Sequence, residues 1–205
     1  GPFVGYPSNP SIEAVLPLDG ELVGGLDVYT VELPVVWDTS WDLLLAEIEV
    51  VQPDIVIGTG VANTDAMRYE VTAVNTEWGT DIDGNPASGG EVVEGGPSSL
   101  ETMLPVEEMA DAVDAAGLPT TLSNDAGTYL CNHIFYHVVH HAELEADWPI
   151  LAGFVHVPPV GYGSALTIEQ VTEAHELGLG ALADWLASGD ARRTPLIETR
   201  EAPVY

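Results

Sequence analysis

The chain has 205 residues, 46% of them hydrophobic, and carries 33 acidic side chains against four Arg and no Lys, for a net charge of −29. This length and hydrophobic content suit one domain with a packed core over residues 1–205, and no apolar run approaches the roughly 20 residues that span a bilayer. So acidic a chain repels nucleic acid, and its single cysteine excludes an internal disulfide. We therefore expect neither nucleic acid nor membrane as a partner.

The acidic residues are spread along the chain among periodic apolar residues, as in a folded protein with an acidic surface. Self-repulsion at this charge destabilises a fold at low ionic strength and is screened when the Debye length falls to about 3 Å near 1 M salt. The first residues lack the basic and apolar regions of a secretory signal. The composition thus predicts a cytoplasmic protein of a salt-adapted organism and does not indicate a chemistry.

Strand-like runs alternate with helical patterns along the chain. We predict strands at 26–36, 54–60, 71–75, 118–123 and 150–158, and helices at 39–51, 105–117, 128–142 and 167–188. Continuously apolar strands between helices are typical of a mainly parallel sheet covered on both faces. The Gly- and Pro-rich residues 77–99 predict a long irregular loop. The fold class is therefore α/β, a three-layer αβα sandwich around a mainly parallel, mixed sheet.

The only cysteine, Cys131, lies in SNDAGTYLCNH (123–133), where a predicted strand gives way to a helix. Open α/β sheets place their sites at the carboxyl ends of strands, and a helix N-terminus stabilises a thiolate. A lone cysteine is also often buried and inert. The pattern therefore leaves a nucleophile and a structural thiol open as alternatives.

A nucleophilic thiol needs a base and a group that orients the base. His156 ends the predicted strand in GFVHVPP (153–159), at the rim where Cys131 is expected, although a structural histidine fits the same position. Glu70 stands at the start of a strand-like run after DIVIGTG (54–60). These residues support a Cys–His–carboxylate hypothesis.

A histidine-rich helical stretch follows Cys131 and suggests a different site. His133 and His137, and likewise His137 and His141, have the i, i+4 spacing that can chelate zinc. No HExxH pattern accompanies them, so an exposed or interface-facing cluster is the favoured interpretation. A metal-binding module built on these histidines remains an alternative.

Four stretches of the sequence, in order, carry a resemblance to a known family: GPFVGYPSNPS (1–11), YEVTAVN (69–75), SNDAGTYLCNHIFY (123–136) and AGFVHVP (152–158). In these blocks the chain resembles the pyroglutamyl-peptidase I (pyrrolidone-carboxylate peptidase) family of intracellular cysteine peptidases. The resemblance implies removal of an N-terminal pyroglutamyl residue from peptides, through an acyl-enzyme and without metal or cofactor. It implies Cys131 as nucleophile, His156 as general base and acid, and Glu70 as the group that orients the imidazole.

The resemblance also implies an apolar pocket for the lactam ring, with Phe3, Tyr129 and Leu130 in its wall, and a homo-oligomer, dimer or tetramer. Several family features are unmatched. The family's first strand has no counterpart, GVANTDAMR (60–68) replaces an Ala-Gly-Gly-Arg turn, and TEWGTDIDG (76–84) lacks an Arg that many members carry. These departures keep a second interpretation open, in which the chain is a non-catalytic or truncated relative that acts as a binding protein.

Overall fold

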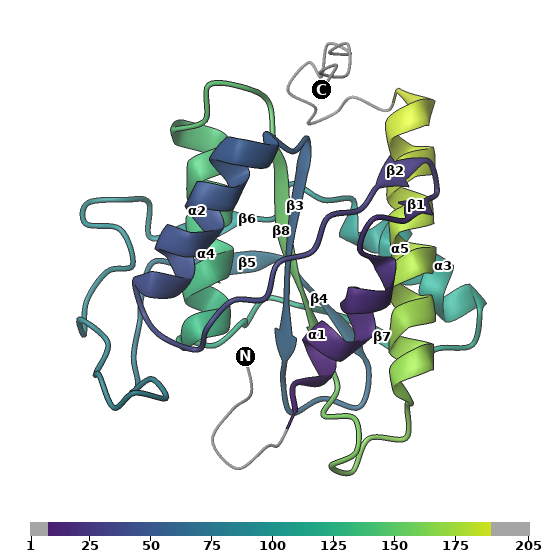
Figure 1. The fold of residues 1–205 in the computed structure, drawn as a ribbon, viewed down its shortest axis with the longest axis horizontal. Helices are drawn as coiled ribbons and strands as arrows, with labels where there is room; N and C mark the ends of the chain where they lie inside the picture. Colours follow the sequence, from purple (N-terminus) through teal and green to yellow (C-terminus); the bar gives the residue numbers. More distant parts are fainter. Residues whose placement is uncertain (1–7, 190–205) are drawn as a thin grey trace.

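The computed structural model describes residues 8–189, which form an α/β fold around a four-stranded central sheet (Figure 1). The strand order is β3-β8-β4-β7. The strands are β3 (Ile55–Val61), β8 (Leu151–Val157), β4 (Met67–Glu70) and β7 (Thr120–Ser123). β3 pairs with β8 and β4 with β7 in parallel, whereas β4 and β8 are antiparallel. The predicted α/β class with a mixed, mostly parallel sheet is confirmed.

Helices cover both faces of this sheet, which gives the predicted three layers (Figure 1). On one side lie α2 (Thr39–Val51) and α4 (Leu130–Leu144), and on the other lie α1 (Pro10–Val15), α3 (Val106–Ala115) and α5 (Ile168–Ser188). A single 3-10 turn (Leu16–Leu18) follows α1. Two antiparallel strand pairs complete the fold: β1 (Leu22–Val23) with β2 (Leu26–Asp27), and β5 (Thr72–Val74) with β6 (Ser99–Glu101). None of the helices within residues 8–189 is long and apolar enough to cross a bilayer.

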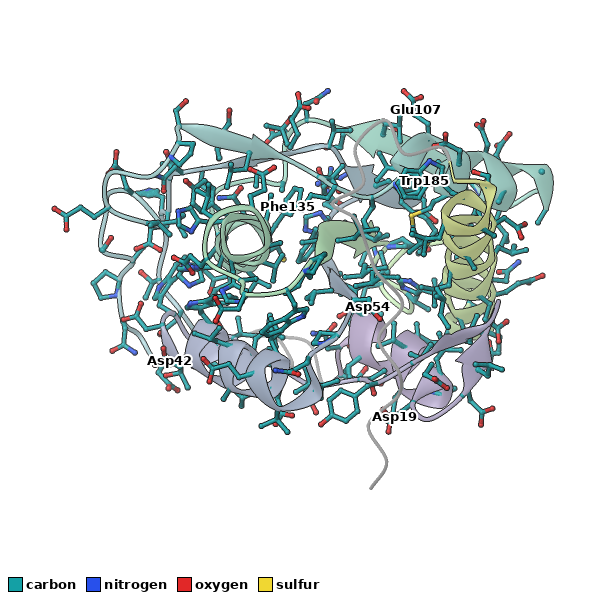
Figure 2. All side chains as sticks on the ribbon, turned by 90° about the horizontal axis from the view of Figure 1, so that it is seen from above. Asp19, Asp42, Asp54, Glu107, Phe135 and Trp185 are labelled. Atoms are coloured by element: carbon teal, nitrogen blue, oxygen red, sulfur yellow. The ribbon has the colours of Figure 1, made fainter. Side chains whose placement is uncertain are left out.

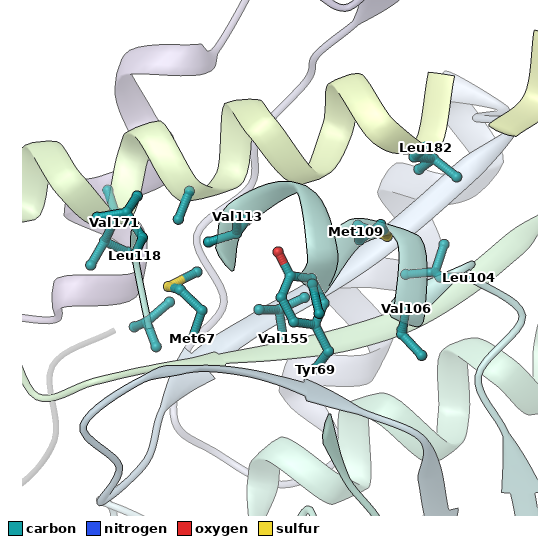
Figure 3. Packing of buried hydrophobic residues seen from close by; sticks show 14 of the residues in the cluster. Met67, Tyr69, Leu104, Val106, Met109, Val113, Leu118, Val155, Val171 and Leu182 are labelled. Atoms are coloured by element: carbon teal, nitrogen blue, oxygen red, sulfur yellow. The ribbon is translucent and has the colours of Figure 1, made fainter. Parts of the chain in front are cut away.

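The alternation of side chains along β8 assigns its residues to the two helical layers. Val155 packs with Tyr69 of β4 in the cluster that α3 and α5 close (Figure 3). Phe154 lies on the opposite face, where its ring is 5.9 Å from that of Phe135 on α4. Because His156 is two residues beyond Phe154, it shares this face. The fold therefore directs its imidazole toward α4, the helix that carries Cys131.

Acidic residues from different parts of the chain lie at the surface. Asp19, Asp42 and Glu107 are exposed and lie at the periphery of the molecule (Figure 2). Phe135, by contrast, points from α4 into the interior (Figure 2) and is fully buried. The core around Phe135 is thus largely apolar, and a few acidic side chains, among them Glu70 and Glu77, are buried.

Most predicted elements are present, with boundaries displaced by a few residues. The strand predicted at 26–36 is wrong for 28–36, because only Leu26–Asp27 pairs with another strand among the described residues. The run at 71–75 forms β5, which belongs to a separate pair, while the central strand is β4 just before it. Helix α1 was not predicted at all, since its six residues are too few to show a clear period.

Candidate active site

Cys131 is the second residue of α4, directly after the loop that leads out of β7. The first N–H groups of a helix have no acceptor within the helix, and they carry the positive end of its dipole. A side chain on Gly60 of β3 would place its Cβ 2.8 Å from the Cys131 Sγ. The glycine therefore leaves space for the thiol against the sheet, at the positive end of α4.

His156 lies opposite the thiol and forms a buried pair with Glu70. Its Nδ1 is 2.7 Å from Glu70 Oε1, although the two residues are 86 positions apart in the sequence. Glu70 is fully buried, and His156 is only 3% exposed. The antiparallel pairing of β4 with β8, which sets Glu70 beside Phe154 and Arg68 beside His156, creates this contact.

The protonation of His156 reflects two opposing effects. Burial disfavours the charged imidazolium and alone would lower the pKa of His156. Hydrogen bonds to the Cys131 side chain and to Glu70, together with Coulombic attraction by both, outweigh burial and raise the pKa to about 9. The arrangement therefore favours an imidazolium between the thiol sulfur and the carboxylate at neutral pH.

Arg68 joins this site, and the sequence analysis did not identify it. Its Nε lies 2.8 Å from Glu70 Oε1, the same oxygen that bonds His156. Its Nη2 also donates to the carbonyl of Asp125, in the loop before α4, at 3.4 Å. Arg68 is the only Lys or Arg between residues 8 and 189, which is the one signal in the sequence that could have drawn attention to it.

Asn132, the residue after the thiol, anchors the start of α4 to the chain that follows β4. Its fully buried amide accepts from the Val74 N–H at 3.0 Å and donates to the carbonyls of Val74 at 2.8 Å and Thr76 at 3.1 Å. A side chain at position 132 that could not form these bonds would leave backbone groups of Val74 and Thr76 unpaired. The asparagine thus fixes the position of the helix that carries Cys131.

Glu77 anchors the irregular loop over the same helix. Its Oε2 lies 2.8 Å from His133 Nδ1, and its Oε1 accepts from the Ser88 N–H at 2.9 Å. The Asn75 side chain holds the next part of this loop, because its amide donates to the Val93 carbonyl and accepts from the Val93 N–H. The loop predicted at 77–99 is therefore held by buried polar side chains next to α4.

The predicted pocket residues have different places in the structure. Leu130 is buried in a cluster with Val35 and Trp37. Tyr129 packs its ring edge-on against Trp37, with centroids 5.2 Å apart, and donates its hydroxyl to the Thr80 carbonyl at 2.9 Å. Phe3 lies outside the described residues. Two of the three residues, Tyr129 and Leu130, thus lie directly before Cys131.

A cavity of about 690 Å³ extends from the thiol along the free edge of β3. Leu130 and Cys131 border it, and aliphatic side chains such as Leu33 and Val35, from the segment before α2, form much of its remaining wall, together with polar residues such as Glu32 and Glu47. β3 pairs only with β8 among the described residues, so its other edge faces this cavity. Cys131 therefore borders a cavity whose wall is apolar in large part.

The histidines of α4 contact different partners, although the rings of His133 and His137 are 4.5 Å apart. His133 binds Glu77, and His141 Nδ1 lies 3.2 Å from Glu145 Oε2. His137 stacks on Trp41 with ring centroids 4.7 Å apart, and burial, with the nearby His133, lowers its pKa to about 3. No group of three or more His, Cys, Asp or Glu side chains within residues 8–189 is arranged to hold a metal ion. The geometry therefore gives no support to the metal-binding alternative.

Comparison with known proteins gives a consistent result. The family model for pyroglutamyl peptidase matches residues 1–179. The pyrrolidone-carboxylate peptidases of Cupriavidus necator and Lactobacillus helveticus are 36% and 37% identical to this chain, over 77% of its length and over 74% and 79% of theirs.

Solved structures of similar proteins agree with the fold. The pyroglutamyl peptidase I from Bacillus amyloliquefaciens matches with a TM-score of 0.85 and 30% identity, covering 89% of this chain and 90% of that one. The pyrrolidone carboxyl peptidase from Thermococcus litoralis matches with a TM-score of 0.85 and 29% identity, covering 91% of each chain. On the strength of the family match and of these relatives, the chain belongs to the pyroglutamyl peptidase family of cysteine peptidases.

Proposed function

We propose that this chain removes the N-terminal pyroglutamyl residue from peptides, with Cys131 as nucleophile, His156 as general base and acid, and Glu70 as the orienting carboxylate. The observation that carries the proposal is the buried imidazole of His156, which lies 2.7 Å from Glu70 Oε1 and whose pKa is raised, against the effect of burial, by the Cys131 side chain and by Glu70. A nucleophile, a base and a group that orients the base are the three parts that covalent acyl transfer requires.

The reaction begins when the Cys131 sulfur attacks the carbonyl carbon that joins the lactam residue to the next amino acid. The thiol proton resides on His156, which then passes it to the leaving amine as the C–N bond breaks. The product of this half-reaction is a pyroglutamyl thioester on Cys131. Water, deprotonated by His156, attacks the thioester, releases pyroglutamate and returns the proton to the Cys131–His156 pair.

The position of Cys131 in the first turn of α4 supports an oxyanion site at its backbone. The N–H groups there have no helical acceptor and point toward the positive end of the helix. Donors that are fixed before the reaction stabilise the developing negative charge without reorganisation. We infer that the Cys131 N–H is one of them.

The lactam ring is flat, uncharged and mostly apolar, and the end of the cavity near Cys131 has matching walls. Leu130 and Val35 border the cavity there, and Tyr129 packs beside them. We propose that these residues, with Phe3, hold the ring. A neutral first residue also suits a protein of net charge −29, since a free carboxylate would be repelled.

The high acidic content further leads us to propose that the enzyme works in a salty cytoplasm and, by analogy with its family, as a dimer or tetramer. Light scattering across a KCl series tests the assembly. A monomer at every salt concentration would reject the oligomer.

The function is tested by hydrolysis of a fluorogenic pyroglutamyl amide in about 2 to 3 M KCl, which shortens the Debye length enough to screen the acidic surface. The parent chain is compared with Cys131→Ser, and an alanyl amide serves as the control substrate. We expect turnover of the pyroglutamyl amide by the parent alone. A folded parent that binds the amide without cleaving it would instead support the binding-protein interpretation.

A further inference from the structure

Arg68 makes an ion pair with the carboxylate that the proposed mechanism uses, and no role has yet been assigned to it. Its Nε is 2.8 Å from Glu70 Oε1, and its side chain is 24% exposed while that of Glu70 is fully buried. Glu70 Oε2 is buried and has no hydrogen-bond partner among the described residues. The Arg68 guanidinium and the His156 imidazole are therefore the two groups that hold this carboxylate, and both use the same oxygen.

The charged and titratable groups that face His156 come from two elements. β4 contributes Glu70 and Arg68, which is the strand partner of His156, and α4 contributes Cys131. From β8 itself the nearest group is the uncharged ring of Phe154, whose centroid is 4.9 Å away. Arg68 is thus the only permanent positive charge in this set.

Arg68 also links the carboxylate to the loop that carries the thiol. Its Nη2 donates to the Asp125 carbonyl, six positions before Cys131. The same guanidinium therefore contacts the carboxylate that orients the base and the backbone that leads to the nucleophile. A planar group with several fixed donors is suited to such a bridge.

We propose that Arg68 is a positioning residue, which fixes the Glu70 carboxylate against His156 and moves the working range of the Cys131–His156 pair toward lower pH. This inference rests on the proposed function for its catalytic meaning. A nearby positive charge makes protonation of both the imidazole and the thiolate less favourable. Loss of that charge raises the proton affinity of both groups, so the sign of the shift is the same for each.

Two substitutions separate charge from packing. Arg68→Gln keeps a polar side chain without the charge, and Arg68→Lys keeps the charge on a flexible stem. We expect the Gln variant to move the acid limb of reactivity upward by about 0.5 to 1 pH unit, the low end of the usual effect of a neighbouring charge. Below that limb its kcat/KM falls by about three- to tenfold, because each pH unit is a factor of ten. The Lys variant should recover most of the shift.

The experiment measures the rate of alkylation of Cys131 by iodoacetamide against pH, together with the pH profile of kcat/KM. Because Cys131 is the only cysteine, the alkylation rate reports on this thiolate alone. Glu107→Gln is the control, since it changes one exposed charge on α3, outside the set of groups that faces His156. Urea unfolding of each variant measures any loss of stability separately.

An upward shift of both profiles in the Gln variant, with recovery in the Lys variant and none in the control, supports the proposal. Unchanged midpoints with lower stability would make Arg68 a purely structural residue and overturn it. Equal shifts in the Gln and Lys variants would also overturn it, because charge would then not be the cause. If the variants show these shifts in alkylation but the parent cleaves no pyroglutamyl amide, the proposed reaction is rejected, while the assignment of Arg68 to the Cys131–His156 pair stands.

Discussion

Two histidines on the same side of the sheet, the buried His156 and the partly buried His137, have pKa values shifted in opposite directions. His156 lies beside the ring of Phe154 and His137 stacks on Trp41, with ring centroids 4.9 Å and 4.7 Å apart, so each imidazole contacts an aromatic ring. Yet the pKa of His156 is raised to about 9, whereas that of His137 is lowered to about 3. Burial lowers both, so burial does not account for the difference.

The difference comes from the partners. His156 bonds a carboxylate and a thiol, while the neighbours that affect His137 are two further histidines, His133 and His140. An ionisable acid beside an imidazole favours the cation, and other imidazoles beside it disfavour the cation. An acidic partner therefore distinguishes His156 from His137, and the thiol of Cys131 distinguishes it from His133, which also faces a buried carboxylate, that of Glu77.

Removal of the thiol should have the largest effect. Cys131→Ser substitutes a much weaker nucleophile, so we expect kcat on a pyroglutamyl amide to fall by at least about 10³-fold. The measurement is initial rates at high salt, with circular dichroism to confirm the fold. His137→Phe serves as the matched control, because it removes an imidazole outside the proposed site. The kcat of this variant should stay within about threefold of that of the parent. Substantial activity in the Ser variant would remove Cys131 from the mechanism.

Removal of the carboxylate charge should come next. Glu70→Gln keeps the shape of the side chain but takes away the attraction that favours the imidazolium, so we expect kcat to fall by about 10²- to 10³-fold and the pKa of His156 to drop. NMR titration of the imidazole follows the pKa. Glu77→Gln is a close control, since Glu77 is also a buried glutamate, 2.8 Å from His133 Nδ1. Equal losses of kcat in the two variants would show that Glu70 acts only through stability.

The sequence could predict much of this fold because local patterns report local structure. β8 is buried along its whole length and reads as a continuous apolar run, and α5 begins at a Thr167–Gln170 capping box. β4 was missed because it contains Arg68 and Glu70, two charged residues in a strand of four. The two charges pair with each other, and their further partners, His156 for Glu70 and the Asp125 carbonyl for Arg68, are far away in the sequence, where no local pattern reveals them.

The candidate site follows the same rule. Cys131 and His156 were predicted as site residues with the help of the family resemblance of the blocks around them, and Glu70 was noted for its position after a predicted strand. The bridge from Arg68 to Asp125 spans 57 residues and depends on how β4 and β7 pair, so it required the three-dimensional structure. For the segment 28–36, apolar β-type residues predicted a strand, but most of these residues line the cavity beside β3 and do not pair with its edge.

A smaller effect is expected on acid stability from the structural histidine. Because the folded-state pKa of His137 lies below the usual 6.5, folding favours the neutral ring, and this stability is present above pH 6.5 and is lost as pH falls toward 3. Between pH 6.5 and 5 the loss is about 2 kcal/mol for one such histidine. His137→Phe keeps an aromatic ring against Trp41 and should remove that loss. Urea unfolding at both pH values measures it. His175, whose pKa burial lowers to about 4, retains its own share in both proteins. An identical decline in parent and variant would contradict the assignment.

The smallest effect is expected from a chelator, and it tests whether the α4 histidines have any role besides packing. His133 and His141 have one ring nitrogen each engaged by a glutamate, and His137 lies flat on Trp41, so these side chains are held by protein partners. Dialysis against EDTA should therefore leave Tm and peptidase rate unchanged in high KCl. A metal ion that binds the folded state stabilises it and raises Tm. Added zinc should therefore leave Tm unchanged if these histidines bind no metal. A zinc-dependent rise in Tm that His137→Phe abolishes would contradict this expectation. The α4 histidines would then form a metal-binding site in addition to the site around His156.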